Sequence, residues 1–222
     1  MELINALRTG TQDLHRRLEQ LPLARALAEG TVARTHYAAL LVQLFHLHRG
    51  LEAELAAQPA LGAVYRPDMA RLPALSRDLQ QFGRPAVDLP LPAIADLVQN
   101  FEDWSVVEPV ALLGSLYVVE GSRMGSLILG KSLARAFGVP LQTGVGLDYH
   151  VEGSAQRPQL WQQFLQGFEA AVPEPQRESV VTAAIVTFQA LYDLYAALPA
   201  TLSPWPVPSV TPAGMALAPA RR

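Results

Sequence analysis

Residues 112–126 read LLGSLYVVEGSRMGS, and this stretch decides how the chain folds. Its apolar residues have helical spacing, while Gly114, Gly121 and Gly125 recur at intervals of seven and four and therefore share one helix face. Glycine inside a helix costs about 1 kcal/mol relative to alanine, so three of them cost about 3 kcal/mol. A face without side chains lets a large flat molecule, or a second helix, approach the backbone closely. The glycines alone leave both interpretations open.

The flanking sequence predicts where this helix begins and ends. Ser105 and Glu108 have the spacing of a capping box, and Pro109 is suited to the first turn of a helix. We therefore expect the helix to open near 108, to run to about 129 and to continue as far as Gly138.

The remainder of the chain is helical by the same criterion. Apolar residues repeat at intervals of three, four and seven over residues 2–20, 34–57, 71–82, 91–103, 158–171 and 174–198. We find no two-residue alternation, no hairpin signal and no internal repeat. The sequence therefore predicts an all-α, single-domain bundle of about seven or eight helices.

Composition sets the limits of the folded domain. Of the 222 residues, 50% are hydrophobic and 17% are charged, which excludes disorder of the whole chain. From residue 199 to 222 the apolar periodicity gives way to six prolines with Ala, Ser, Thr and Gly. We expect one folded domain over residues 1–198, followed by a Pro/Ala-rich, disordered tail over 199–222.

Charge and cysteine content exclude several function classes. The net charge of −3, from 17 basic and 20 acidic residues, argues against an obligate nucleic-acid binder. The absence of cysteine excludes a disulfide scaffold, a thiolate zinc site, an iron–sulfur cluster and thiolate-ligated haem. The N-terminus has no signal pattern, and the uncharged stretch from Pro109 to Val119 is too short to span a bilayer. We expect a cytoplasmic protein that does not bind membranes.

The first helix contains a candidate metal ligand. Arg8, Thr11, His15 and Glu19 follow one another at intervals of three, four and four, which places them on one polar stripe. A neutral His15 imidazole could bind a metal through one nitrogen while Glu19 holds the other N–H. Arg8 is placed to meet a carboxylate of the same ligand. The alternative is an ordinary solvated face of an amphipathic helix.

Other catalytic motifs are missing. The sequence has no dinucleotide-binding glycine motif, no Walker loop, no His-Glu-x-x-His and no Gly-x-Ser-x-Gly. None of the five histidines follows a glutamate by three residues, which excludes the di-iron sites of ferritin-like bundles. A cofactor ligated by histidine is one of the few remaining routes to redox chemistry in a helical protein.

Two segments together resemble the bacterial haem oxygenases. They are residues 14–19, LHRRLE, and residues 116–126, LYVVEGSRMGS. The second is similar to the family string Tyr-Val-x-Glu-Gly-Ser-x-Leu-Gly-Gly, and the helix order agrees over about residues 2–198. The resemblance implies oxidative ring-opening of haem, which is both substrate and cofactor, to biliverdin with release of CO and iron. It also implies O2 and an external electron donor, namely a ferredoxin, a flavodoxin or a reductase.

The resemblance assigns roles on the side of the first helix. It implies that His15 is the axial ligand of the haem iron and that Glu19 steadies its other nitrogen. Arg8 matches a basic position that pairs with a haem propionate. Thr11 lies on the same polar stripe as Arg8 and His15, and we expect it to contact the cofactor as well.

The resemblance also assigns roles on the glycine-containing helix. Gly121 and Gly125 match the glycines whose backbone lies over the haem, and Ser122 matches a serine beside them that serves proton delivery. Tyr117 matches a tyrosine that reaches a propionate, and Lys131 a basic residue that helps to seat the haem.

Two positions depart from the family string. Met124 replaces leucine with little change in volume. Ser126 replaces the second distal glycine, and its side chain is expected to enter space that is normally empty. This departure keeps a second function open, a haem carrier or sensor that has lost turnover. A third is a helical interaction protein without haem, in which the glycines serve packing.

The remaining histidines and aromatic residues have structural interpretations. His36, His46, His48 and His150 do not match the ligand position, and His48 is expected to form a surface pair with Glu52. A further set is expected to build the core and to edge the pocket: Trp161, Phe164, Phe168 and Phe188.

Overall fold

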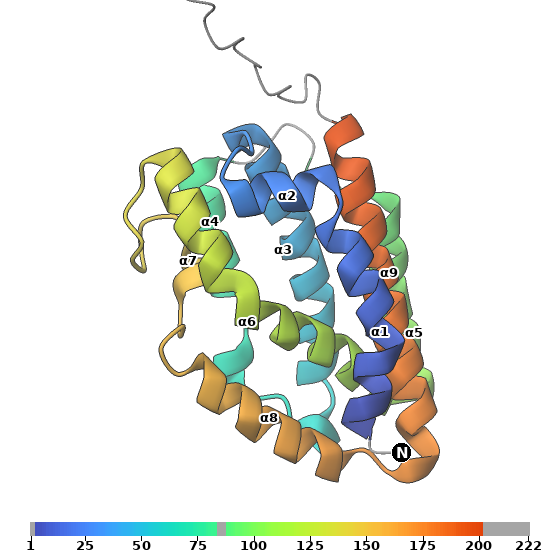
Figure 1. Ribbon diagram of the computed structural model, residues 1–222. Coiled ribbons are helices and arrows are strands. Elements are labelled where there is room, and N and C mark those ends of the chain that lie inside the picture. Colours follow the sequence, from blue (N-terminus) through green and yellow to red (C-terminus); the bar gives the residue numbers. More distant parts are fainter. Residues whose placement is uncertain (1–2, 84–87, 202–222) are drawn as a thin grey trace, which may run out of the picture.

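The computed structural model describes residues 3–83 and 88–201 and confirms the all-α fold. Within these residues there are nine α-helices and no strand. Their bounds are α1 Leu3–Glu19, α2 Pro22–Glu29, α3 Arg34–Ala56, α4 Leu72–Phe82, α5 Pro92–Val107, α6 Leu112–Phe137, α7 Asp148–Val151, α8 Arg157–Ala171 and α9 Arg177–Thr201. Figure 1 shows them as one bundle.

Two short helices were not expected from the sequence. The eight residues of α2 run from Pro22 to Glu29, and the helix is closed by Gly30, whose φ of 74° is in the left-handed region that favours glycine. The four residues of α7 are capped from another helix: Asp78 of α4 accepts hydrogen bonds from the amides of Asp148 and Tyr149 at 2.8 and 3.0 Å. Neither helix is long enough to show an apolar period, so the pattern missed both.

The proposed capping box at Ser105 and Glu108 is wrong. Ser105 lies inside α5, where its hydroxyl donates to the carbonyl of Glu102 at 2.8 Å. Pro109 instead begins a short 3-10 turn, Pro109–Ala111, which leads into α6. The end of α6 is as predicted, with Gly138 in the left-handed conformation at φ 64°.

The long last helix, α9, lies along one side of the bundle and has several helical neighbours. It packs against α1, α5 and α6, and its Val180, Ala184 and Leu194 are fully buried. The segment Glu174–Pro199 is long and apolar enough to cross a membrane by length and composition alone. Of the apolar window in this segment, 39% is buried, where α9 packs against the other helices.

The first glycine of the 112–126 segment serves this packing. A Cβ on Gly114 would lie 2.1 Å from the carbonyl oxygen of Val180 and 2.9 Å from the amide of Ala184. Such distances are far inside van der Waals contact, so α6 can reach α9 here only because residue 114 is glycine. Gly114 therefore has the packing role that the sequence left open.

The last helix, α9, ends within three residues of Leu198, the predicted end of the folded domain. Leu198 is buried, and α9 continues through Pro199 to Thr201. The rest of the predicted tail, residues 202–222, lies outside the described residues.

Candidate active site

The structure brings His15 and Glu19 together on α1, as predicted. His15 Nδ1 lies 3.6 Å from Glu19 Oε1, and both side chains are exposed, at 57% and 60%. This distance suits a weak direct contact or a bridging water. With Glu19 at Nδ1, the other ring nitrogen, Nε2, is the one directed to an incoming metal. The ring of Phe188, on α9, stands edge-on to the imidazole with centroids 5.6 Å apart.

One face of α6 combines two glycines with exposed apolar side chains. A Cβ on Gly125 would have no atom within 4 Å, and Gly125 itself is exposed. A Cβ on Gly121 would touch only the indole of Trp161, at 3.4 Å. Met124 and Ile128, at helical spacing from these glycines, are 42% and 68% exposed. The face is therefore an apolar strip on which a flat molecule can reach the main chain.

Arg8 and Tyr117 join the two helices. The guanidinium of Arg8, on α1, lies close enough to the phenol of Tyr117, on α6, to influence its pKa. Partial burial raises the pKa of Tyr117, and the positive charge of Arg8 lowers it, so the phenol stays neutral. The predicted propionate-binding residues thus lie side by side.

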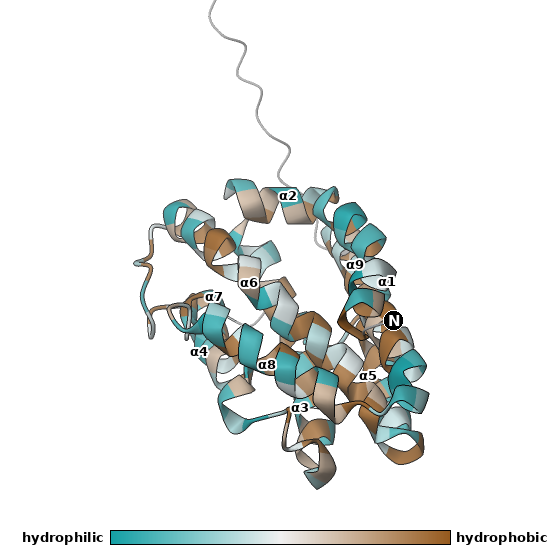
Figure 2. Ribbon diagram, turned by 60° about the horizontal axis from the view of Figure 1, so that its bottom comes forward, coloured by the Kyte–Doolittle hydropathy of each residue, from teal (hydrophilic) through white to brown (hydrophobic). Residues whose placement is uncertain are grey.

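Beyond this contact α1 and α6 diverge. Figures 1 and 2 both show the two helices separating from their N-terminal halves toward α2. Both helices pack against α9, and α2 packs against α6, where Gly30 comes close to the carbonyl of Ser132. His15 on α1 and Gly125 on α6 both follow the Arg8–Tyr117 contact in their helices. His15 and Gly125 therefore lie in the parts of α1 and α6 that diverge from each other.

Three other predicted residues are placed less favourably. Thr11 is buried with the leucines rather than on the polar stripe, and its hydroxyl donates to the carbonyl of Leu7 at 2.8 Å. Its place on the stripe was a wrong expectation. Ser122 is exposed, but its hydroxyl donates to the carbonyl of Val119 at 2.7 Å. Lys131 is exposed further along α6.

The expectation for Ser126 is wrong. Its side chain is buried on the opposite side of α6 from the exposed strip, and its hydroxyl is hydrogen-bonded to Nδ1 of His150 at 2.7 Å. A helix turns about 100° per residue, so the side chain of Ser126 leaves α6 in a different direction from the open side of Gly125. In that direction it contacts α7. The serine therefore leaves the space beside the glycines open.

The His48–Glu52 pair is buried, which corrects the surface pairing expected from its spacing. The two side chains are 4% and 9% exposed, with His48 Nδ1 3.0 Å from Glu52 Oε1. The backbone amide of Arg71 donates to the same carboxylate at 2.7 Å, and the hydroxyl of Tyr149 lies 3.2 Å from His48 Nε2. Spacing alone could not distinguish this pair from His15–Glu19.

The aromatic residues divide between the core and the site. Phe164 and Phe168 are buried in the core. Trp161 and Phe188 are half-buried and face Gly121 and His15, respectively. No signal in the sequence separated these two from the others, because all four occupy helical apolar positions.

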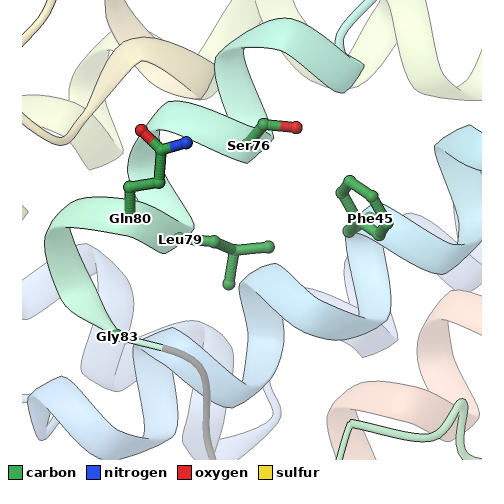
Figure 3. A pocket seen from close by; sticks show the side chains of 5 residues that line it. All are labelled: Phe45, Ser76, Leu79, Gln80 and Gly83. Atoms are coloured by element: carbon green, nitrogen blue, oxygen red, sulfur yellow. The ribbon is translucent and has the colours of Figure 1, made fainter.

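A pocket of about 500 Å³ lies elsewhere, between α3 and α4 (Figure 3). It is lined by Phe45, Ser76, Leu79, Gln80 and Gly83. It contains none of the predicted site residues, so we do not connect it with the chemistry of His15.

The site residues fit haem. An imidazole with a carboxylate at its second nitrogen provides a metal ligand, and the bare strip around Gly125 accommodates a flat apolar ring. The cation of Arg8 suits the carboxylates at the edge of such a ring.

Known proteins support this interpretation. Residues 1–197 match the family model described as "Heme oxygenase". "Heme oxygenase 1" of Pongo abelii is 25% identical over 207 residues, covering 87% of this chain and 72% of that protein. The structure of heme oxygenase from Leptospira interrogans has a TM-score of 0.77 and 25% identity, and the match covers 88% of this chain and 99% of that one. Heme oxygenase-1 from Synechocystis sp., in complex with heme, shares the fold with a TM-score of 0.79 at 20% identity, over 90% and 94% of the two chains. This chain belongs to the haem oxygenase family.

Proposed function

We propose that the chain is a cytoplasmic oxidoreductase that binds haem between α1 and α6 and opens the ring to biliverdin, with release of CO and iron. O2 and electrons from an external donor complete the reaction. One observation carries the proposal: His15, with Glu19 at Nδ1, and the bare backbone of Gly121 and Gly125 belong to the two diverging helices. Membership of the family over residues 1–197 supports it.

On α1, His15 binds the iron through Nε2. The carboxylate of Glu19 accepts from Nδ1–H, directly or through water, and so holds the imidazole in the required tautomer and orientation. Phe188 supports the ring from α9 and limits its rotation. A neutral imidazole would donate less electron density to the iron than a thiolate does, and so would promote O–O cleavage at the iron less strongly. Haem supplies the redox chemistry, and the protein positions it.

On α6, Gly121 and Gly125 allow the main chain to lie against the ring and to exclude bulk water. Ser122 is adjacent and exposed, and its oxygen still has lone pairs that can accept from an ordered water while its proton is bonded to Val119. That water can deliver the proton that the reaction consumes. We therefore assign the catalytic face to Gly121, Ser122 and Gly125.

At the edge of the ring, Arg8 and Tyr117 bind a propionate. Their proximity places a cation and a neutral hydroxyl together, which suits one carboxylate. Lys131, exposed on α6, is assigned to seating the haem. Thr11 receives no ligand contact, since its hydroxyl is bonded to Leu7.

The haem carrier or sensor is not favoured. Its rationale was that Ser126 blocks the distal space, and the Ser126 side chain is instead directed to His150.

Titration of the purified protein with haem, followed by turnover, tests the proposal. The wild type should give a Soret band that is lost with appearance of bilin when a reductant and O2 are supplied. His15→Ala should lose the axial ligand and turnover, whereas Gln12→Ala, an exposed control on α1, should behave as the wild type. A His15→Ala protein with normal ligation and turnover would refute the assignment. A wild-type spectrum that does not change under electrons and O2 would indicate a carrier.

A further inference from the structure

We infer that Arg157 and the His150–Ser126 pair are positioning residues that hold the bare segment of α6 at its place over the haem. The inference rests on the proposed function. It concerns the back of α6, the side turned away from the glycines, which neither the resemblance nor the proposed chemistry uses.

Arg157 ties α6 to the end of α7. Its side chain is almost completely buried at the start of α8. One guanidinium nitrogen, Nη1, donates to the carbonyl of Arg123 at 2.7 Å, and the other, Nη2, donates to the carbonyls of His150 and Glu152, each at 3.0 Å. Hydrogen bonds from a charged donor are stronger than those between neutral groups. A single side chain therefore links one backbone position in α6, one in α7 and one directly after α7.

The carbonyl of Arg123 makes this link unusual. It lies in the interior of α6, where a carbonyl ordinarily serves only the helix's own hydrogen-bond ladder. A side chain that bonds to such a carbonyl is one of the recognised causes of helix bending. Figure 1 shows that α6 changes direction along its length, with α7 and α8 on one side of it.

Ser126 and His150 form the second link, one turn further on. Both residues are 6% exposed, and Ser126 Oγ lies 2.7 Å from His150 Nδ1. The close approach requires Gly130, because a Cβ there would stand 3.0 Å from that of His150. The imidazole is itself held, stacked on Tyr37 with an interplanar angle of 27° and edge-on to Tyr149.

These two links lie on either side of Gly125 in the sequence and on a different face of the helix. Arg123 precedes Gly125 by two residues and Ser126 follows it by one, so their Cα atoms lie about 200° before and about 100° after that of Gly125 around the helix axis. Gly121 and Gly125 consequently face away from these hydrogen bonds. We infer that the hydrogen bonds fix the position of the glycine-containing segment of α6 relative to α1. We name Arg157, His150 and Ser126 the clasp.

The proposed reaction needs such a fixed backbone. The position at which the haem is opened would depend on how closely the main chain at Gly121 and Gly125 approaches the ring, and a displacement of about 1 Å can cost about 100-fold in rate. A loosened α6 should therefore change the distribution of biliverdin isomers as well as the rate. General loss of stability would lower the amount of folded enzyme without changing that distribution.

The test compares Ser126→Ala, Ser126→Thr and Arg157→Gln with Ser105→Ala. Ser105 is a matched control, since its hydroxyl also bonds to a helix carbonyl but lies on α5. Hydrogen–deuterium exchange of the haem-free proteins is measured first. Amides of residues 122–130 should exchange at least 10-fold faster in Ser126→Ala and Arg157→Gln, with amides of α3 unchanged, and Ser126→Thr should restore most of the protection.

The second measurement is the isomer composition of the bilin made by the haem-loaded variants. Ser126→Ala and Arg157→Gln should give a second isomer as 10% or more of the product, whereas Ser126→Thr and Ser105→Ala keep the wild-type composition. Unchanged exchange, exchange that rises equally in α3, or an unchanged isomer composition would each overturn the inference. Ser126→Ala, which removes one hydroxyl, keeps the test valid if Arg157→Gln fails to fold.

The two measurements separate this inference from the proposed function. If the wild type makes no bilin, the proposed function fails, and with it the role over haem. If the wild type makes bilin and the variants match it in exchange and product, the clasp alone is refuted.

Discussion

The carboxylate of Glu169, on α8, accepts a hydrogen bond from the backbone amide of Leu3 at 3.1 Å and caps the first turn of α1. Its second oxygen accepts from the amide of Ile4 at 3.2 Å, and Arg177 lies 3.5 Å from the first. A negative charge at a helix N-terminus satisfies free N–H groups and interacts favourably with the helix dipole. The helix that carries His15 is thus fastened at its start by the helix that carries Trp161.

Removing this cap should destabilise the protein modestly. Glu169→Ala is expected to lower the free energy of unfolding by about 1–2 kcal/mol, because two amides of α1 lose their partner. Urea unfolding gives the value, with Glu102→Ala, an exposed substitution on α5, as control. A loss no larger than that of the control would show that water replaces the cap without cost.

Two glycines of α6 should respond oppositely to alanine. At Gly125 a Cβ meets nothing, so Gly125→Ala is expected to raise the free energy of unfolding by up to about 1 kcal/mol. The same methyl should lower haem affinity, since it stands where the ring approaches the backbone. Thermal unfolding of the haem-free protein and haem titration measure the two effects, and unchanged haem affinity would contradict the assigned face.

Gly114→Ala provides the contrast. Its methyl would lie 2.1 Å from the carbonyl oxygen of Val180, so α6 and α9 must move apart. We expect a loss of about 1–3 kcal/mol or more, by the mechanism of overpacking. The same unfolding experiment decides this, and a stability equal to that of the wild type would show that α9 yields easily.

Acid should weaken the fold through His150. Burial, with the nearby charge of Arg157, lowers the pKa of His150 from 6.5 to about 4. Between these values the unfolded chain binds the proton and the folded protein does not, so stability is fully present above pH 6.5 and is lost as the pH falls to 4. A gap of this size corresponds to about 3 kcal/mol.

The difference between the wild type and His150→Asn isolates this effect, because asparagine keeps a polar group beside Ser126 but does not titrate. Asp78 acts in the opposite direction: burial raises its pKa from 3.8 to about 6, so it weakens the fold as the pH rises through that range. Asp78 is common to both proteins and cancels in the comparison. Parallel stability curves for the two from pH 4 to 7 would contradict the prediction.

Two His–Glu pairs with the same four-residue spacing should differ in energy. Glu52→Ala leaves buried donors of His48 and Arg71 without a partner and is expected to cost about 3 kcal/mol. Glu19→Ala removes an exposed contact and should change stability by less than about 0.5 kcal/mol, while weakening iron ligation by His15. Urea unfolding and the spectrum of the haem complex measure these effects. If Glu52→Ala and Glu19→Ala lowered the free energy of unfolding equally, the result would be inconsistent with the burial of the His48–Glu52 pair.

The helices themselves could be predicted because their causes are local. The apolar period over 2–20 and 34–57 corresponds to α1 and α3, and Gly138 ends α6 where a left-handed residue is required. The exceptions have non-local causes. The short α7 exists because Asp78, 70 residues away, caps it, and Ser105 fails as a cap because α5 continues through it.

The proximity of His15 and Glu19 could also be predicted, since the two residues are one turn apart on a single helix. The neighbours on other helices could not. Spacing placed Gly114 with Gly121 and Gly125, but α9 covers the first and leaves the last open.

The amino-acid order thus determined the helices, the imidazole–carboxylate pair and the bare face of α6, because each depends on neighbours within a turn or two. Only the folded molecule decided which glycine is open, that Ser126 bonds to His150, that Arg157 reaches into α6 and that His48 is buried. Burial and contacts between helices depend on how separate segments pack, and no local pattern carries that information.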